Sequence, residues 1–172
     1  MSPVRFSRRR RLGRSRLAIS IESAEVERLE EMATKALPNE TGGVLVGSRS
    51  DERMWVLCAL EIWAEDPRPN RYVLAVERAN EMLGRFVSDA GLPEEFGYVG
   101  TWHSHPSDSG PSPLDLATLR QDSLGQGHAT ASLVIVRRDQ ERWEHNWLVA
   151  DGRDVGTANV RNENHRSSGD RL

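Results

Sequence analysis

The sequence has only one cysteine, Cys58, which excludes an internal disulfide framework and a zinc site built from several thiolates. Apolar residues make up 37% of the 172 residues, and the mean hydropathy is −0.59. No apolar run approaches the roughly 18 residues that a membrane-spanning helix needs. These shortages predict a globular protein without a membrane segment, and the scarcity of cysteine favours a reducing cytoplasm.

Acidic residues are missing from the start of the chain. Residues 1–21 hold seven arginines and no acid, whereas the whole sequence has a net charge of −3. The remainder is therefore acidic, which is unfavourable for general nucleic-acid binding. We interpret residues 1–16 as a disordered, solubilising arm, with binding to nucleic acid or to an acidic partner as the alternative.

Hydrophobic periodicity predicts alternating strands and helices. The predicted strands cover residues 17–21, 41–47, 54–64, 72–75, 97–105, 131–137 and 142–149, and the predicted helices cover residues 22–37, 76–90 and a segment beginning after Ser112. The last two strands form a hairpin. This order predicts an α/β (α+β) sandwich in which helices flank a mostly antiparallel mixed sheet. The domain is expected to span residues 17–150, and residues 151–172 are interpreted as a polar, largely mobile tail.

The most informative segment is Trp102-His103-Ser104-His105-Pro106. Side chains alternate between the two faces of a strand, so His103 and His105 project to one face and Trp102 to the other. Two neutral imidazoles on one face at a strand end are able to chelate one metal ion. Taken alone, the pattern also suits two half-exposed strand histidines without a metal.

A third ligand is available where the next helix begins. Ser112 suits the N-cap, Pro113 suits the first helical position, and Asp115 falls in the first turn. Two histidines and one aspartate suit Zn²⁺ and leave a fourth coordination position for water, which is the arrangement of a catalytic zinc. Without a metal, Ser112 and Asp115 would form an ordinary helix cap.

Metal-assisted hydrolysis also needs a proton acceptor. Glu40 is the candidate, because it follows a helix end and directly precedes the glycine-rich strand that starts Thr41-Gly42-Gly43. The glycines indicate a bulge or a close approach of two backbones. Glu40 alone could be a surface acid, but its combination with the histidine pair and the capped aspartate is far more specific than any one part.

This combination resembles the JAB/MPN family of zinc metalloproteases, whose JAMM motif reads here as Glu40-Thr-Gly-Gly, His103-Ser-His105-Pro and Ser112-Pro-Leu-Asp115. The resemblance covers about residues 17–150 and is closest to the compact bacterial JAB domains. It implies a cytidine-deaminase-like sandwich and one Zn²⁺ per chain, bound by His103, His105 and Asp115. It also implies that Glu40 is the general acid/base and that Ser112 stabilises an oxyanion.

The chain departs from the family pattern at one place. Nine residues separate His105 from Asp115, one fewer than is usual in the family, so the missing residue falls within residues 107–110. This makes Asp108 the alternative metal ligand. Asp115 is favoured because a helix start is a firmer platform than a loop rich in serine and glycine.

The resemblance implies a peptidase that cleaves after the C-terminal tail of a ubiquitin-like or sulfur-carrier protein, with E1-like and E2-like proteins as further partners. An antiviral conjugation system and sulfur-carrier processing are both compatible settings. Two alternatives remain open. One is a non-catalytic binding scaffold, and the other is a DNA-associated protein that uses its arginine arm.

The remaining histidines and tryptophans lack such a pattern. We expect His128, His145 and His165 to be structural or surface residues, and Cys58 to be a small core residue. We expect four tryptophans to pack the core or line an apolar groove: Trp55, Trp63, Trp143 and Trp147.

Overall fold

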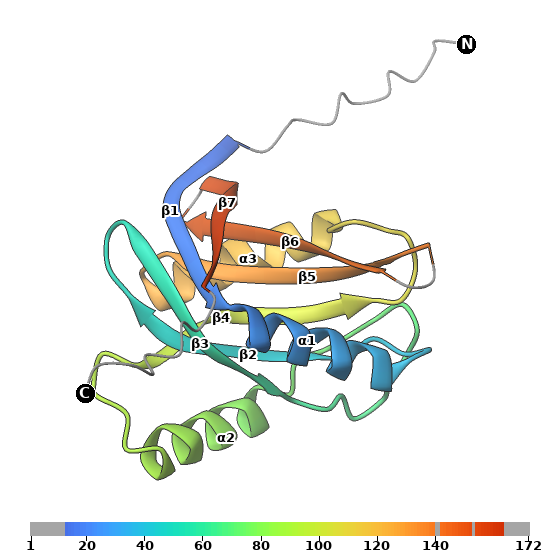
Figure 1. Ribbon diagram of the computed structural model, residues 1–172, viewed down its shortest axis with the longest axis horizontal. Coiled ribbons are helices and arrows are strands. Elements are labelled where there is room, and N and C mark those ends of the chain that lie inside the picture. Colours follow the sequence, from blue (N-terminus) through green and yellow to red (C-terminus); the bar gives the residue numbers. More distant parts are fainter. Residues whose placement is uncertain (1–12, 140–141, 153, 164–172) are drawn as a thin grey trace, which may run out of the picture.

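The computed structural model describes residues 13–139, 142–152 and 154–163. These residues form a mixed α+β fold with three helices and seven strands (Figure 1). The helices are α1 (Ser23–Ala36), α2 (Val76–Asp89) and α3 (Pro113–Gln126). The strands are β1 (Gly13–Glu22), β2 (Gly42–Arg49), β3 (Arg53–Glu61), β4 (Gly97–His105), β5 (Thr130–Arg138), β6 (Arg142–Asp151) and β7 (Asp154–Glu163).

The strands form one mixed sheet in the order β1-β3-β2-β4-β5-β6-β7, and it closes into a barrel because β1 also pairs with β7. The pairs β2–β3, β2–β4, β5–β6 and β6–β7 are antiparallel. The pairs β1–β3, β1–β7 and β4–β5 are parallel. The predicted mixed sheet with flanking helices is therefore confirmed, whereas its closure was not predicted.

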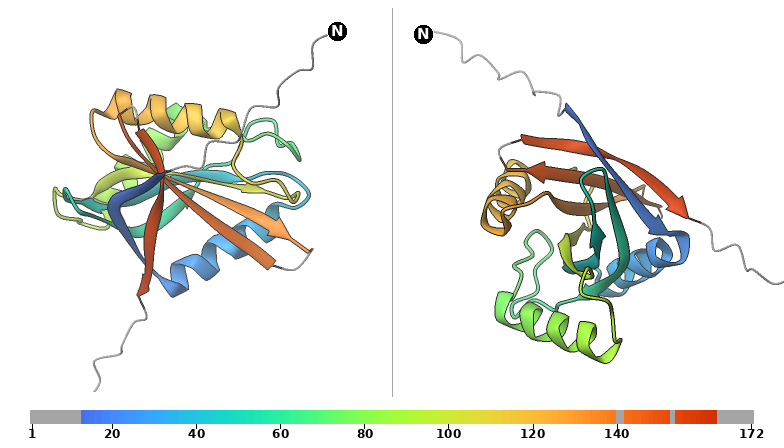
Figure 2. Two further views of the ribbon diagram at one scale, coloured as in Figure 1. Left: turned by 90° about the horizontal axis from the view of Figure 1, so that it is seen from above. Right: turned by 90° about the vertical axis from the view of Figure 1, so that its left-hand side faces the viewer.

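Helices α1 and α3 lie on opposite sides of the strands (Figure 2, left), and the residue alternation within the strands explains how both are covered. In β5, Leu133 and Ile135 join the large apolar cluster that contains Leu29 of α1. Their neighbours Val134 and Val136 join a second cluster, with Leu119 of α3. Because β5 is apolar on both faces, it is a central strand of the core.

Helix α2 covers a third apolar cluster beside β2. Ala79 of α2 packs there with Val44 and Ile62. The face of β2 and β4 that carries this cluster continues towards the end of β4, where His103 and His105 lie.

Strand β7 corrects the predicted tail. Residues 154–163 were expected to be mobile, but they pair with β1 in parallel and with β6 in antiparallel register. The signal was weak because few residues of β7 are apolar, although Val155 and Val160 do pack against the core. Residues 13–16 of the predicted arm belong to β1, and residues 1–12 and 164–172 lie outside the described residues.

One smaller prediction also fails, because the expected strand at residues 72–75 is irregular. Trp63, which was expected to pack the core or to line an apolar groove, is 71% exposed, and this excludes the core. Trp147 is buried as expected, and Trp102 lies buried on the core side of β4, the face opposite the histidines that the sequence predicted for it. Among the described residues, none of the helices combines the length and the apolar character that crossing a membrane requires.

The glycine pair that opens β2 does mark close backbone approaches. A Cβ atom on Gly43 would lie 1.8 Å from the carbonyl oxygen of Leu60, and one on Gly42 would lie 2.4 Å from that of Trp102. Any side chain at these positions would overlap with backbone atoms of β3 or β4. The two glycines therefore let three strands come together next to Glu40.

We expect Gly43→Ala to destabilise the fold by about 3 kcal/mol, because the added methyl group overlaps with backbone that cannot yield. For a chain of this size that corresponds to a loss of roughly 6–12 °C in Tm. Gly84→Ala is the matched control: nothing lies within 4 Å of the added atom, and alanine favours the helix, so Tm should rise slightly. Thermal unfolding followed by circular dichroism measures both, and equal Tm values for the two variants would contradict this account.

Candidate metal centre

The end of β4 presents two imidazoles to the same face of the sheet. The side chains of His103 and His105 are 14% and 10% exposed. Their Nε2 atoms are 3.0 Å apart, and their ring centroids are 4.9 Å apart. Trp102 and Ser104 point the other way and are fully buried. The two-residue period of the strand thus produces the predicted histidine pair.

The carboxylate of Asp115 is held in front of these rings by the cap of α3. The Ser112 hydroxyl accepts a hydrogen bond from the Asp115 backbone N–H (3.2 Å), and Asp115 Oδ2 accepts one from the Ser112 N–H (2.6 Å). This reciprocal pair is a capping box, with Pro113 at the first turn. The capping residues predicted from the sequence are confirmed, and the cap fixes the direction in which Asp115 points.

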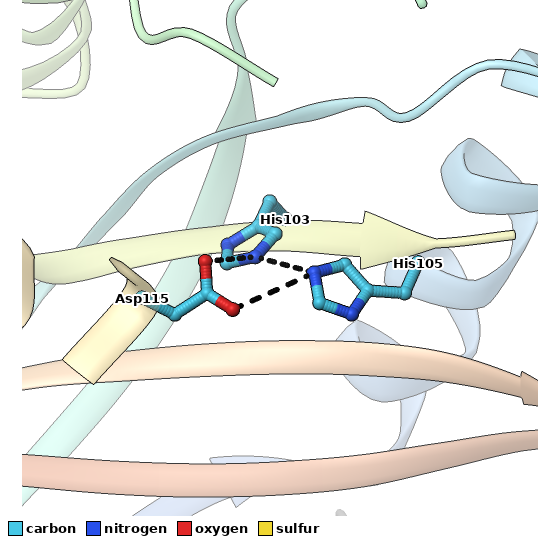
Figure 3. Close-up of side chains that lie close together, drawn as sticks. All are labelled: His103, His105 and Asp115. Carbon is cyan, nitrogen blue, oxygen red and sulfur yellow. Dashed lines mark hydrogen bonds and ion pairs between the residues drawn. The ribbon is translucent and has the colours of Figure 1, made fainter. Parts of the chain in front are cut away.

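The three side chains converge (Figure 3). Asp115 Oδ1 lies 3.3 Å from His103 Nε2, and Oδ2 lies 3.7 Å from His105 Nε2. One ligand atom from each of the three residues can be chosen so that all lie within 4.8 Å of one another. Two nitrogens and one oxygen at this separation fit a single first-row metal ion and leave a coordination position open. The geometry could therefore hold a metal ion.

The electrostatics of Asp115 favour its ligating form. Burial alone would raise the pKa of this carboxyl, but the hydrogen bond and charge of His103 and the hydrogen bonds of Ser112 outweigh burial and hold the pKa well below its usual range. Asp115 is therefore a carboxylate at neutral pH. An ionised carboxylate is the form that binds a metal.

The orientation of His105 is fixed from behind. Its Nδ1 lies 2.7 Å from the backbone carbonyl of Ser109. Because a carbonyl only accepts hydrogen bonds, Nδ1 carries the proton and donates it, which leaves the lone pair on Nε2 directed at the cluster. Metal-ligating histidines are commonly oriented by such a partner, and nothing in the sequence pattern indicated Ser109.

The alternative ligand Asp108 lies outside the cluster. Its carboxylate pairs with Arg138 at the end of β5, and it is absent from the group of His103, His105 and Asp115. The shorter segment between His105 and Asp115 therefore does not displace Asp115. Of the two aspartates that the sequence left open, Asp115 is the one that the fold brings to the histidines.

Glu40 precedes β2 and is close enough to the cluster to interact electrostatically with His105 and Asp115. Its backbone N–H donates to the carbonyl of Arg68 (2.8 Å), and its carboxylate accepts from the backbone of Tyr72. Burial raises the pKa of Glu40 to about 7, with the charge of His105 opposing this rise and that of Asp115 adding to it. A carboxyl group that titrates near neutral pH is suited to taking up and releasing a proton.

A link between Glu40 and the histidines was not predicted. The Ser104 hydroxyl accepts a hydrogen bond from the Thr41 N–H (3.1 Å), and the Ser104 N–H donates to the Thr41 carbonyl (2.8 Å). The residue next to Glu40 is thus bound to the residue between the two histidines. A short polar residue on the buried face of an apolar strand was the only signal in the sequence.

Comparisons with known proteins agree with this geometry. The family described as prokaryotic homologues of the JAB domain matches residues 23–149. A solution structure of the protein DSY2949 from Desulfitobacterium hafniense is similar in fold, with a TM-score of 0.65 and 20% sequence identity over 89% of this chain and 99% of that one. No curated protein matches the sequence significantly.

Removing a member of the cluster should weaken metal binding strongly. We expect His103→Ala and Asp115→Ala to weaken binding of a divalent metal, with zinc as the probe, by more than about 100-fold, because each removes a side chain that would bind the metal directly and not merely a group that orients such a side chain. Asp108→Ala should still bind one equivalent. Mass spectrometry of metal content after dialysis against zinc measures both, and metal loss in Asp108→Ala alone would reverse the assignment.

Glu40 should make the metal-free protein sensitive to pH. Because its pKa is raised to about 7 in the fold, its ionisation costs stability as pH rises through that value, whereas below its unfolded pKa of about 4.3 there is no cost. We expect Glu40→Gln to be more stable than the wild type by about 1–2 kcal/mol above neutral pH, after allowing for solvent screening of a half-buried group, and equally stable in acid.

Urea unfolding of chelator-treated protein at both pH values tests this expectation, with Glu27→Gln, an exposed acid of α1, as the control. A stabilisation that is the same at both pH values would show that the ionisation of Glu40 is not its cause.

Proposed function

The chain belongs to the family of prokaryotic JAB domains, and on that premise we propose that it is a zinc-dependent peptidase that cleaves after the C-terminal tail of a ubiquitin-like or sulfur-carrier protein. The observation that carries the proposal is the convergence of His103, His105 and Asp115 beside an acid of raised pKa, Glu40. A carboxyl group whose pKa burial raises into the range of proton transfer favours an enzyme over a scaffold.

Each residue has a role in hydrolysis of a peptide or isopeptide bond. A zinc ion bound by the two histidines and Asp115 would supply Lewis acidity, polarising the scissile carbonyl and acidifying a water molecule. Glu40 accepts a proton as the water oxygen attacks the carbonyl carbon. It then delivers that proton to the amine as the C–N bond breaks.

Ser112 is compatible with a second role. Its hydroxyl oxygen accepts from the Asp115 N–H, so its own hydrogen remains available to donate. In the proposed reaction that hydrogen bonds to the oxyanion of the tetrahedral intermediate. The capping interaction then orients the hydroxyl instead of competing with the reaction.

The closed sheet restricts where a substrate tail can pair. The outer edge of β3 is protected, because the Ala59 N–H donates to Glu25 and the Ala59 carbonyl accepts from Arg28. The irregular segment of residues 62–75 adjoins Glu40 through Arg68 and carries the exposed side chains of Trp63 and Val73. We propose that an extended tail lies along this segment, where backbone groups give affinity and apolar side chains give selectivity.

The proposed biological setting follows from the substrate class. Ubiquitin-like and sulfur-carrier tails are activated and transferred by E1-like and E2-like proteins, so these are the proposed partners, in antiviral conjugation or in sulfur-carrier processing. A cytoplasmic location is consistent with the single cysteine, Cys58. We also propose the cytidine-deaminase-like description for the arrangement of helices on the sheet.

Cleavage of tail fusions tests the proposal. We expect the wild type to release the C-terminal partner from a fusion with a ubiquitin-like tail, and a chelator to stop the release. Glu40→Gln should reduce kcat/KM by about 100- to 10,000-fold, the usual contribution of a general base, while it retains zinc. Glu27→Gln, which changes an exposed acid on α1, is the control.

The alternatives predict other outcomes. A binding scaffold would hold the tail without cleaving it, and Glu40→Gln would change nothing. A DNA-associated protein would bind DNA in a strongly salt-dependent way that is lost when residues 1–16 are deleted. The peptidase assignment is wrong if zinc-loaded protein cleaves none of the tails tested and instead holds a tail uncleaved or binds DNA in this salt-dependent way.

A further inference from the structure

The ring of His105 depends on a loop that has little structure of its own. Residues 106–112 connect β4 to α3, and Ser109 supplies the carbonyl that accepts from His105 Nδ1 (2.7 Å). The contacts within the loop are short-range: the Ser109 N–H donates to the Ser107 carbonyl, and the two serine hydroxyls are 3.0 Å apart. Residues 107–110 are all exposed. Local contacts among exposed residues do not hold a carbonyl in one place.

One long-range contact does tie this loop to the sheet. The carboxylate of Asp108, the residue directly before Ser109, pairs with the guanidinium of Arg138. Arg138 closes β5, opposite Arg142 of β6, and it also pairs with Glu144 of β6 at 2.9 Å. The three charges form a chain from the loop across two strands, with Arg138 in the middle.

The side chains of Asp108, Arg138 and Glu144 differ in how exposed they are to solvent. The side chain of Arg138 is 30% exposed, whereas those of Glu144 and Asp108 are 47% and 66% exposed. Arg138 is thus the fixed member, held on the sheet by its strand and by Glu144. Its planar fork of donors is able to serve two carboxylates at once.

We propose that Arg138 is a positioning residue for the metal centre: through Asp108 it holds the Ser109 carbonyl against His105 Nδ1, so that His105 Nε2 faces the metal. This inference rests on the proposed function only for the reason why His105 must be oriented. The contacts that orient His105 are present in the protein without metal. Within the described residues, Arg138 pairs with Asp108 and Glu144 and not with the candidate ligands themselves. Arg138 favours one tautomer of His105 indirectly, through Asp108 and the Ser109 carbonyl.

The alternative interpretation is that the Asp108–Arg138 pair is an ordinary exposed ion pair without a role in orienting His105. Such pairs contribute little, and another exposed pair lies in the same hairpin, between Arg142 and Asp139 at 3.3 Å. The Arg142–Asp139 pair is local and more exposed, with side chains 79% and 81% exposed, and only Asp108 adjoins a residue that orients a metal ligand. Arg142 is therefore the matched control for Arg138.

The first test measures the tautomer in metal-free protein. Long-range ¹H–¹⁵N spectra of the imidazole nitrogens distinguish a proton on Nδ1 from one on Nε2. We expect His105 to be the Nδ1–H tautomer in the wild type and in Arg142→Ala. Asp108→Ala and Arg138→Ala should both give a mixture of tautomers. If His105 keeps the wild-type pattern in both variants, the positioning role is refuted, whatever the protein catalyses.

The second test measures zinc affinity by competition with a chromophoric chelator. A group that hydrogen-bonds directly to a metal-binding side chain commonly contributes about 10- to 100-fold to metal affinity. Because Arg138 acts one contact further away, we expect a loss of roughly three- to tenfold in each single variant. The double variant Asp108→Ala/Arg138→Ala should be no weaker than either single variant, since both break the same connection. Additive losses, or a loss equal to that of Arg142→Ala, would refute the inference.

The two readouts separate the possible failures. A protein that binds no zinc would overturn the proposed function, but the tautomer spectra would still decide whether Arg138 orients His105. Normal zinc binding with unchanged spectra in every variant would leave the proposed function intact and remove Arg138 from it.

Discussion

The site depends on two hydrogen bonds that join Thr41 to Ser104. They fix the register in which Gly42 lies opposite His103, and that register brings an acid from the start of β2 to a histidine pair at the end of β4. Because side chains alternate along a strand, a slip of one residue would turn both histidines into the core and Trp102 out of it. The identity of residue 104 therefore matters even though its side chain faces away from the site.

The cap of α3 also contributes to the site. The N-terminus of a helix leaves backbone N–H groups without partners, and a capping box satisfies them with side chains. Here Asp115 caps the helix with Oδ2 while Oδ1 faces His103. The interaction that caps the helix also orients a candidate metal ligand, so Asp115 serves both as a capping residue and as a candidate ligand. The loop before the helix is then free to vary in length without moving Asp115.

Much of this could be predicted from sequence because the relevant periods are short. The two-residue repeat of a strand placed His103 and His105 together, and the spacing of Ser112 and Asp115 indicated the cap. What could not be predicted depends on residues that meet only in the folded chain. Neither Arg68 beside Glu40 nor Arg138 beside Asp108 belongs to a repeating pattern. Strand β7 was missed because its few apolar residues alternate too weakly to stand out from a polar segment.

The parallel pairing of β1 with β7 gives the domain a direction. Gly13 lies beside Gly156 and Glu22 beside Glu163, and β3, β4 and β5 run the same way as β1. Five of the seven strands, β1, β3, β4, β5 and β7, therefore share one direction, and β2 and β6 run against them. Because β1 pairs with both β3 and β7, a change that detached β1 would open the sheet on two sides at once, so the closure of the barrel depends on the first and the last strand of the described chain together.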